Sequence, residues 1–79
     1  MEEKKWITTE QMLEELKKDA NHEHGYSLLL YSGFLTSPHW LVFDSERQMF
    51  EHDANVDFGW NTEAEILEVY ADCMWCRFA

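Results

Sequence analysis

The sequence predicts a small α+β fold in which a helix, a three-stranded antiparallel meander and a second helix surround one hydrophobic core (αβββα). Two capping-box signatures mark helix starts, and three short apolar segments separated by turn residues lie between them. The 79 residues, 46% of them apolar, suffice for one core but not for two. We therefore expect a single domain over residues 1–79, with residues 1–5 as a loose N-terminus and both helices packed on one sheet face.

The first helix is predicted to begin after Thr8. The Thr8 hydroxyl can accept from the amide of Gln11 while the Gln11 side chain reaches back, which is the capping-box pattern. An apolar stripe then runs from Met12 to Leu16 at helical spacing. The polar segment 21–25 is expected to end the helix.

Three strands are predicted in the middle of the chain. Residues 26–35 are rich in Leu and Tyr, and residues 39–43 and 48–52 form two shorter segments of the same kind. Residues 44–47 predict a tight hairpin turn between the second and third strands. The connections are short, so the strands should form an antiparallel meander.

The last third of the chain predicts a loop and then a long apolar helix. Residues 53–61 indicate the loop, and Thr62 with Glu65 gives a second capping box for a helix that extends to about Arg77. One face of this helix is acidic, at Glu65, Glu68 and Asp72. A helix that is apolar over most of its remaining surface must be buried or docked, which favours a homodimer as one possible state.

The charge balance restricts the class of partner. Sixteen acidic residues against six basic ones give a formal net charge of −10, which argues against direct binding to nucleic acid or to an anionic membrane. A basic protein is the expected partner. We find no signal-peptide pattern and no apolar stretch long enough to span a membrane, so a cytoplasmic location with reduced thiols is expected.

The candidate partner-binding surface lies in the acidic second half of the chain. Its carboxylates can imitate the spaced phosphates of a nucleic acid, and two aromatic residues in the loop can anchor an interface. Ordinary solubilising charge is the alternative explanation. The candidate residues are Asp53, Asp57, Phe58, Trp60, Glu63, Glu65, Glu68 and Asp72.

Two sets of residues have the ligand types of a metal site, although no metal or cofactor is expected. His22 and His24 with Cys73 and Cys76 have the ligand types of a tetrahedral zinc site. The competing interpretation is two buried core cysteines and two solvated histidines. The oxygen-rich segment 53–65 resembles a calcium loop, but its register is wrong for an EF-hand, so a polar loop with Asx turns is favoured.

No catalytic motif is complete. The chain has no nucleophile elbow, phosphate-binding loop, zincin helix or dinucleotide fingerprint, and a domain of this length offers little that could exclude water from an active site. We therefore expect a binding protein and no enzyme.

One segment carries a resemblance to a known family. Gly59, Trp60 and Asn61, followed by Glu63, Glu65, Glu68, Tyr70 and Asp72, resemble part of a small phage anti-CRISPR protein that inhibits a CRISPR effector nuclease. The resemblance covers residues 59–72 and the order of elements. It implies an acidic α+β protein that covers a DNA-binding surface without catalysing a reaction.

These observations together favour a small acidic inhibitor, encoded by a phage or mobile element, that binds a basic nucleic-acid-processing protein and blocks its substrate site. An immunity protein against a bacterial toxin would share the acidity and the absence of catalysis. A metal-binding module is the third hypothesis.

Overall fold

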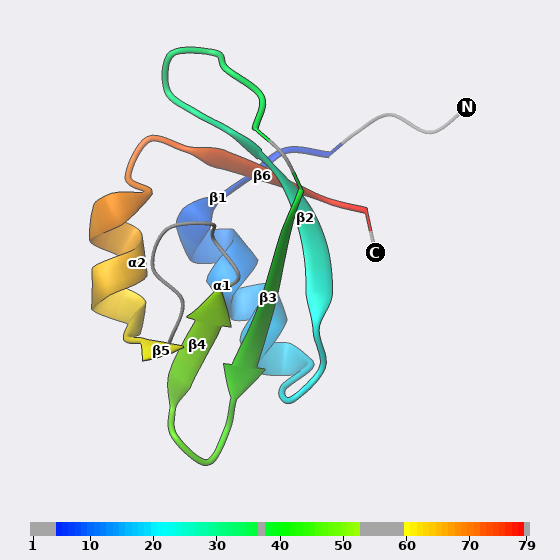
Figure 1. The fold of residues 1–79 in the computed structure, drawn as a ribbon, viewed down its shortest axis with the longest axis vertical. Coiled ribbons are helices and arrows are strands. Elements are labelled where there is room, and N and C mark those ends of the chain that lie inside the picture. The colour runs from blue at the N-terminus through cyan, green and yellow to red at the C-terminus, as the bar shows by residue number, and fades with distance from the viewer. Residues whose placement is uncertain (1–4, 37, 53–59, 79) are drawn as a thin grey trace.

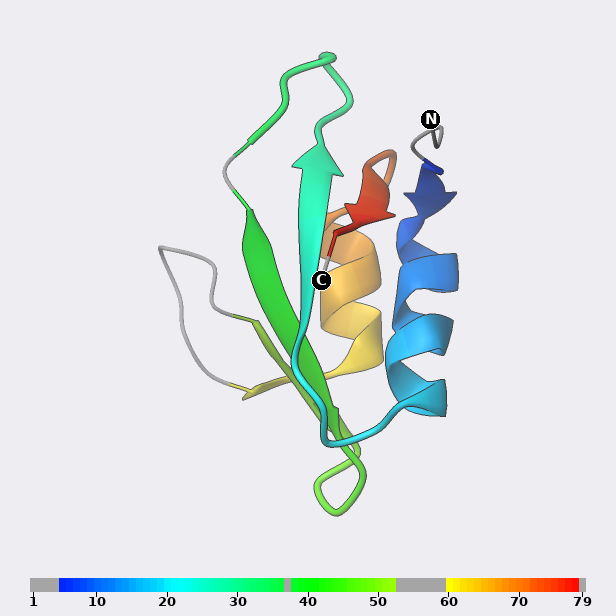
Figure 2. The same cartoon turned by 90° about the vertical axis from the view of Figure 1, so that its right-hand side faces the viewer.

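The computed structural model describes residues 5–36, 38–52 and 60–78, and shows one antiparallel sheet that curves around two helices like half of a barrel (Figures 1 and 2). Its elements in chain order are β1 (Ile7–Thr8), α1 (Thr9–Lys18), β2 (His24–Leu29), β3 (His39–Asp44), β4 (Met49–His52), β5 (Trp60–Asn61), α2 (Glu63–Val69) and β6 (Met74–Arg77). The strands lie in the order β1-β6-β2-β3-β4-β5.

The predicted αβββα architecture is wrong, because the described residues form a sheet of six strands instead of three. Strands β2, β3 and β4 are antiparallel neighbours, in the central region where the meander was expected. Three further strands extend the sheet on both sides. Two of these, β1 and β5, are only two residues long, too short for an alternating pattern to be recognised in the sequence.

The predicted last helix is wrong in its second half. Helix α2 ends at Val69, and Asp72 then adopts a left-handed backbone conformation with a φ of 51°, which an α-helix cannot continue through. The following residues form β6, which lies between β1 and β2. Its register places Trp75 opposite both Ile7 and Leu28. The apolar run near the C-terminus is therefore a strand with two apolar faces.

The core lies between the sheet and the two helices, which are on the same side of the sheet (Figure 2). Alternate residues of β2 point inward, so that Tyr26 and Leu28 are buried beside Trp75. Helix α1 contributes Met12, Leu13 and Leu16, all fully buried. Neither helix of the described residues has the length and apolar character needed to cross a membrane.

Local side-chain chemistry fixes the ends of several elements as predicted. Thr8 and Gln11 form the expected capping box before α1. The hairpin between β3 and β4 is closed by Asp44, whose Oδ1 accepts from the backbone N–H groups of Glu46 at 2.8 Å and Arg47 at 3.0 Å. The first predicted strand is shorter than expected: β2 stops at Leu29, before the turn that contains Gly33.

Candidate protein-binding surface

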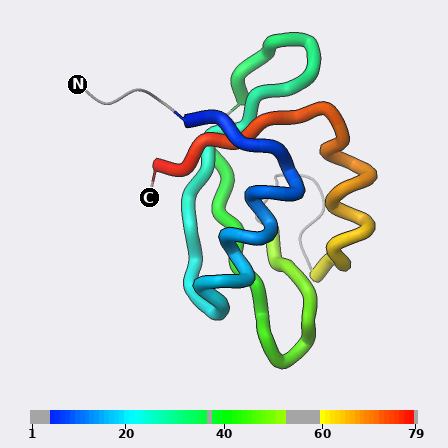
Figure 3. Tube along the Cα trace, turned by 180° about the vertical axis from the view of Figure 1, so that it is seen from behind, coloured from blue at the N-terminus to red at the C-terminus, as the bar shows by residue number. Residues whose placement is uncertain are grey.

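The two helices form a layer that covers the inner side of the sheet. Figure 3 shows them from this side. At one end of the layer, the Thr9 hydroxyl at the start of α1 donates to the carbonyl of Tyr70 at the end of α2, at 2.7 Å. At the other end, Lys17 Nζ donates to Glu63 Oε1 at 2.9 Å. The helices are therefore antiparallel neighbours, and their outward surfaces belong to one face of the molecule.

This face is rich in carboxylates. We use the name acidic helical layer for the acidic residues of the two helices and of the turn after α2, namely Glu10, Glu14, Glu63, Glu65, Glu68 and Asp72. All of these side chains are exposed except that of Glu63, which is partly exposed. Four of the six were predicted for partner binding: Glu63, Glu65 and Glu68 of α2, and Asp72 of the turn that follows it. Glu10 and Glu14 of α1 were not predicted, because the position of α1 beside α2 is a tertiary feature.

Lys17 neutralises part of this charge. Its ammonium group lies 2.7 Å from Glu14 Oε2 as well as 2.9 Å from Glu63 Oε1. The hydrogen bond to Glu14 is the main reason that the pKa of Lys17 is raised, and the same hydrogen bond lowers the pKa of Glu14. The charge that remains available for an external partner is therefore concentrated at the other acidic residues of the layer.

Glu65 has a structural role as well as a charge. Its Oε1 accepts from the backbone N–H of Thr62 at 2.7 Å and from the Thr62 hydroxyl at 3.1 Å, while Thr62 Oγ1 accepts from the backbone N–H of Glu65. This is the predicted capping box, and it fixes the start of α2. Replacing Glu65 by Lys would therefore disturb the helix along with the surface charge.

Glu68 and Asp72 are the exposed acids at the other end of α2. Glu68 lies within the helix, whereas Asp72 lies in the turn that leads to β6. The acidic face predicted for one continuous helix is thus formed by a short helix and the turn that follows it. Because this turn is left-handed at Asp72, a substitution there should be to Asn, which tolerates such a conformation.

Trp60 lies on a different part of the molecule. It pairs with Glu51 across β4 and β5, and directly opposite residues of an antiparallel pair share a sheet face. Glu51 is exposed between the buried Phe50 and His52, so this face is the one away from the helices. The Arg47 guanidinium stacks over the Trp60 ring, 4.3 Å from its centroid. Trp60 is thus separated from the acidic helical layer by the sheet.

The other predicted members of the surface are Asp53, Asp57 and Phe58. They lie outside the described residues, as does most of the calcium-like segment and of the predicted loose N-terminus.

The histidines considered for zinc belong to a cluster of polar side chains around Asp19 and Arg77. Asp19 Oδ1 lies 2.8 Å from His22 Nδ1, and Asp19 Oδ2 lies 2.9 Å from His24 Nε2, although the latter pair is not aligned as a hydrogen bond. The hydrogen bond with His22 lowers the pKa of Asp19. Arg77 Nη2 lies 2.7 Å from His24 Nδ1. Since a guanidinium can only donate, His24 Nδ1 is the acceptor and its proton is on Nε2.

The two cysteines point to opposite faces of the sheet. Trp75 faces the core, so by strand alternation Cys73 lies on the same side as Trp75 and Cys76 on the other. Both are free thiols, and burial raises the pKa of Cys73. In the part of the chain that the structure describes, no three His, Cys, Asp or Glu side chains gather into a metal-binding arrangement.

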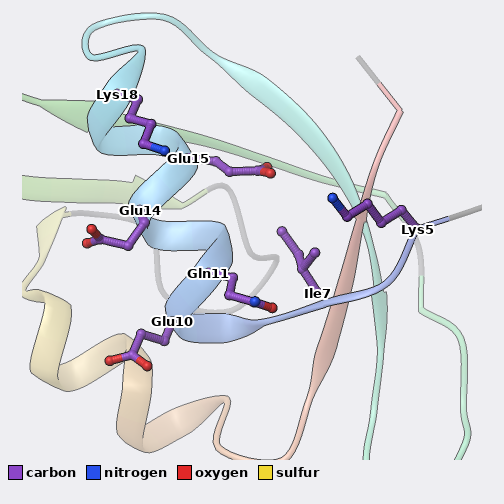
Figure 4. Close-up of a pocket in the computed structure, with 7 residues that line it drawn as sticks. All are labelled: Lys5, Ile7, Glu10, Gln11, Glu14, Glu15 and Lys18. Carbon is purple, nitrogen blue, oxygen red and sulfur yellow. The ribbon is translucent and has the colours of Figure 1, made fainter.

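A shallow hollow runs along α1, on the edge of the acidic helical layer (Figure 4). It is lined by Lys5, Ile7, Glu10, Gln11, Glu14, Glu15 and Lys18. Glu15 is held inside the molecule's own hydrogen-bond network, because its Oε1 accepts from the Tyr26 hydroxyl at 2.9 Å. Two lysines and three carboxylates line the hollow, so it presents charges of both signs.

A polar network inside the half-barrel was not predicted. His39 Nδ1 lies 2.9 Å from His52 Nε2, His39 Nε2 lies 3.0 Å from Thr36 Oγ1, and His52 Nδ1 lies 3.5 Å from the Tyr70 hydroxyl. Thr36 donates its hydroxyl proton to the carbonyl of Leu28. The alternation of β3 and β4 is the signal that could have found this network, because His39 and His52 occupy the same faces as the core residues Leu41 and Phe50.

The network runs through hydroxyl groups and ring nitrogens. The Thr36 hydroxyl donates to the Leu28 carbonyl and can accept from His39 Nε2–H, and the two imidazoles meet through His39 Nδ1 and His52 Nε2. The Tyr70 hydroxyl lies at the far end of the network, beside His52 Nδ1. The network links β3, β4 and α2 through polar groups that sit within the aromatic core.

No protein-family model matches this chain, and neither a curated protein nor a solved structure matches it. The resemblance to anti-CRISPR proteins stays a prediction from residues 59–72.

Proposed function

We propose that this protein is a small inhibitory binding protein that covers the nucleic-acid site of a basic partner, such as a CRISPR effector. The observation that carries the proposal is the acidic helical layer. It presents exposed carboxylates from two antiparallel helices and from the turn after α2. No catalytic step is part of this function.

The chemistry of binding follows from the charge. A net charge of −10 attracts a basic groove over several ångströms and accelerates encounter, and the attraction weakens as salt screens it. Glu68 and Asp72 are exposed at one end of the layer, and Glu10 is exposed on the adjacent start of α1. Carboxylates spread over this surface would occupy positions that phosphates take in the nucleic acid.

The test is an affinity capture from bacterial lysate with the tagged protein, repeated with excess duplex DNA and at raised salt. Proteins retained on the resin are identified by mass spectrometry. We expect a basic nucleic-acid-binding protein that both treatments release, and whose activity the purified protein inhibits. Retention of a partner that DNA does not displace would contradict occupation of the nucleic-acid site.

A further inference from the structure

The outer face of the sheet, away from the helices, carries a second surface of a different kind. The register of the strands defines it. Leu29 is opposite both Met74 and Leu35, and Gly25 is opposite Trp40. In β2, Tyr26 and Leu28 face the core. Gly25 and Leu29 alternate with them, so these two residues and the residues opposite them in the neighbouring strands face outward. We call it the aromatic sheet face, and it comprises Leu29, Leu35, Trp40, Met74 and Phe78.

The aromatic pair of this face is held in a fixed position. The Phe78 ring meets the Trp40 ring edge to face, with centroids 5.4 Å apart and an interplanar angle of 75°. It also lies directly over Gly25, where a Cβ atom would come within 2.6 Å of Phe78 Cζ. The backbone N–H of Phe78 donates to the Gly25 carbonyl at 2.9 Å. Gly25 therefore makes the space in which the ring is seated, and little ordering entropy would be lost on binding.

Large apolar groups of this face nevertheless remain in contact with solvent. The exposed fraction is 51% for Leu35, 48% for Phe78 and 36% for Trp40. Fixed aromatic side chains that remain exposed are typical anchors of protein interfaces. Val69 is exposed to a larger fraction, 69%, but it lies on α2, the helix that carries three residues of the acidic helical layer.

The five residues of the aromatic sheet face are uncharged, and the charged Glu51 and Arg47 lie farther along the same side of the sheet, beside Trp60. The sequence has no Asp, Glu, Lys or Arg between Gly25 and Phe43, the segment that supplies three of its five residues. The outward residues of β6, Met74 and Cys76, are also uncharged. A basic protein would be directed to the acidic helical layer, on the other side of the molecule. A partner for the aromatic sheet face must itself present an uncharged apolar surface.

We propose that this face pairs with the same face of a second copy of the chain. A two-fold arrangement matches one uncharged surface with an identical one, and stacks two sheets as in a β-sandwich. It also places the two acidic helical layers on opposite outer sides, where the repulsion between two molecules of charge −10 is smallest. Any pairing through the helices would instead bring like charges together. The dimer is independent of the proposed function and leaves both acidic layers accessible.

The experiment is sedimentation equilibrium of the full chain from micromolar to millimolar concentration, at low and at raised salt. We expect the mass to rise from 9.5 kDa to twice that value, with an association that raised salt strengthens or leaves unchanged. Phe78→Glu should weaken the dimer at least tenfold, because it places a charge at the centre of the interface. Val69→Glu is the matched control: it adds the same charge on α2 and should leave the association unchanged.

Circular dichroism tests whether both variants keep the fold. We expect that they do, because both side chains are partly exposed in the monomer. A wild-type chain that stays monomeric at millimolar concentration would overturn the proposal. So would equal association of Phe78→Glu and wild type, or an equal loss in both variants. Association that raised salt dissolves would place the contact on charged groups and would also overturn it.

Discussion

The Thr9 hydroxyl joins three parts of the molecule with one oxygen atom. It donates to the carbonyl of Tyr70 at 2.7 Å and accepts from the indole N–H of Trp75 at 2.8 Å. Thr9 is 5% exposed and Trp75 is completely buried, so water cannot replace either bond. This single side chain therefore fixes the start of α1 against the end of α2 and the centre of β6.

We expect Thr9→Val to lower the free energy of unfolding by about 1–3 kcal/mol, because it keeps the shape but leaves the buried indole N–H without an acceptor. Urea unfolding followed by tryptophan fluorescence measures this. Ser32→Ala removes a hydroxyl from an exposed turn and serves as the control. An equal effect of the two substitutions would show that the bridging oxygen has no special role.

Tyr26 makes the fold sensitive to alkaline pH. Its ring is fully buried, and burial together with the hydrogen bond to Glu15 raises its pKa above the ordinary value of 10.0. The folded state then keeps the phenol proton at a pH where the unfolded state loses it. The resulting stability is complete below pH 10 and decreases as the pH rises above it.

Above that pH, the free energy of unfolding should fall by up to about 1.4 kcal/mol per pH unit owing to this residue. Denaturant titrations at increasing pH measure the slope. Tyr26→Phe should reduce it, whereas Tyr31→Phe, at a side chain that is 84% exposed, should not. Identical slopes in the two variants would rule out Tyr26 as the cause.

At the scale of elements, the starts of both helices could be predicted from the sequence because each depends on residues three positions apart. Thr8 with Gln11 and Thr62 with Glu65 form the predicted capping boxes. The end of α2 could not be predicted in the same way. Residues 70–76 are apolar enough to fit a helix or a buried strand, and the pairing of β6 with strands far away in the sequence decides between them.

Helix α2 has only seven residues, so its N-terminal cap should contribute more to its stability than the helix propensities of its residues do. We expect Thr62→Ala to cost about 1 kcal/mol and to increase hydrogen exchange in the amides of α2. Glu65→Gln is the control, since the amide oxygen can still accept from Thr62 while the charge is removed. Faster exchange in both variants, or in neither, would show that the capping box does not hold the helix.

At the scale of the whole molecule, the sheet separates the two proposed surfaces. The acidic helical layer is on one side and the aromatic sheet face on the other. The acidic residues of α2 were predictable as a candidate surface because they are close in sequence. The sequence could not predict that Glu10 belongs to this layer or that Trp60 lies on the other side of the sheet. Both depend on which elements become neighbours in the folded protein.

The most direct test of this account compares two triple variants with the same net charge of −7, changed from −10 by three neutralised acids each. One carries Glu10→Gln, Glu68→Gln and Asp72→Asn in the acidic helical layer. The control carries Glu23→Gln, Glu46→Gln and Glu51→Gln, which are exposed elsewhere. Their dissociation constants for the captured basic partner are measured as a function of salt. We expect a loss of at least tenfold and a shallower salt dependence for the first variant only. Equal weakening of both, or unchanged binding by the first, would contradict the assignment of this layer as the binding surface.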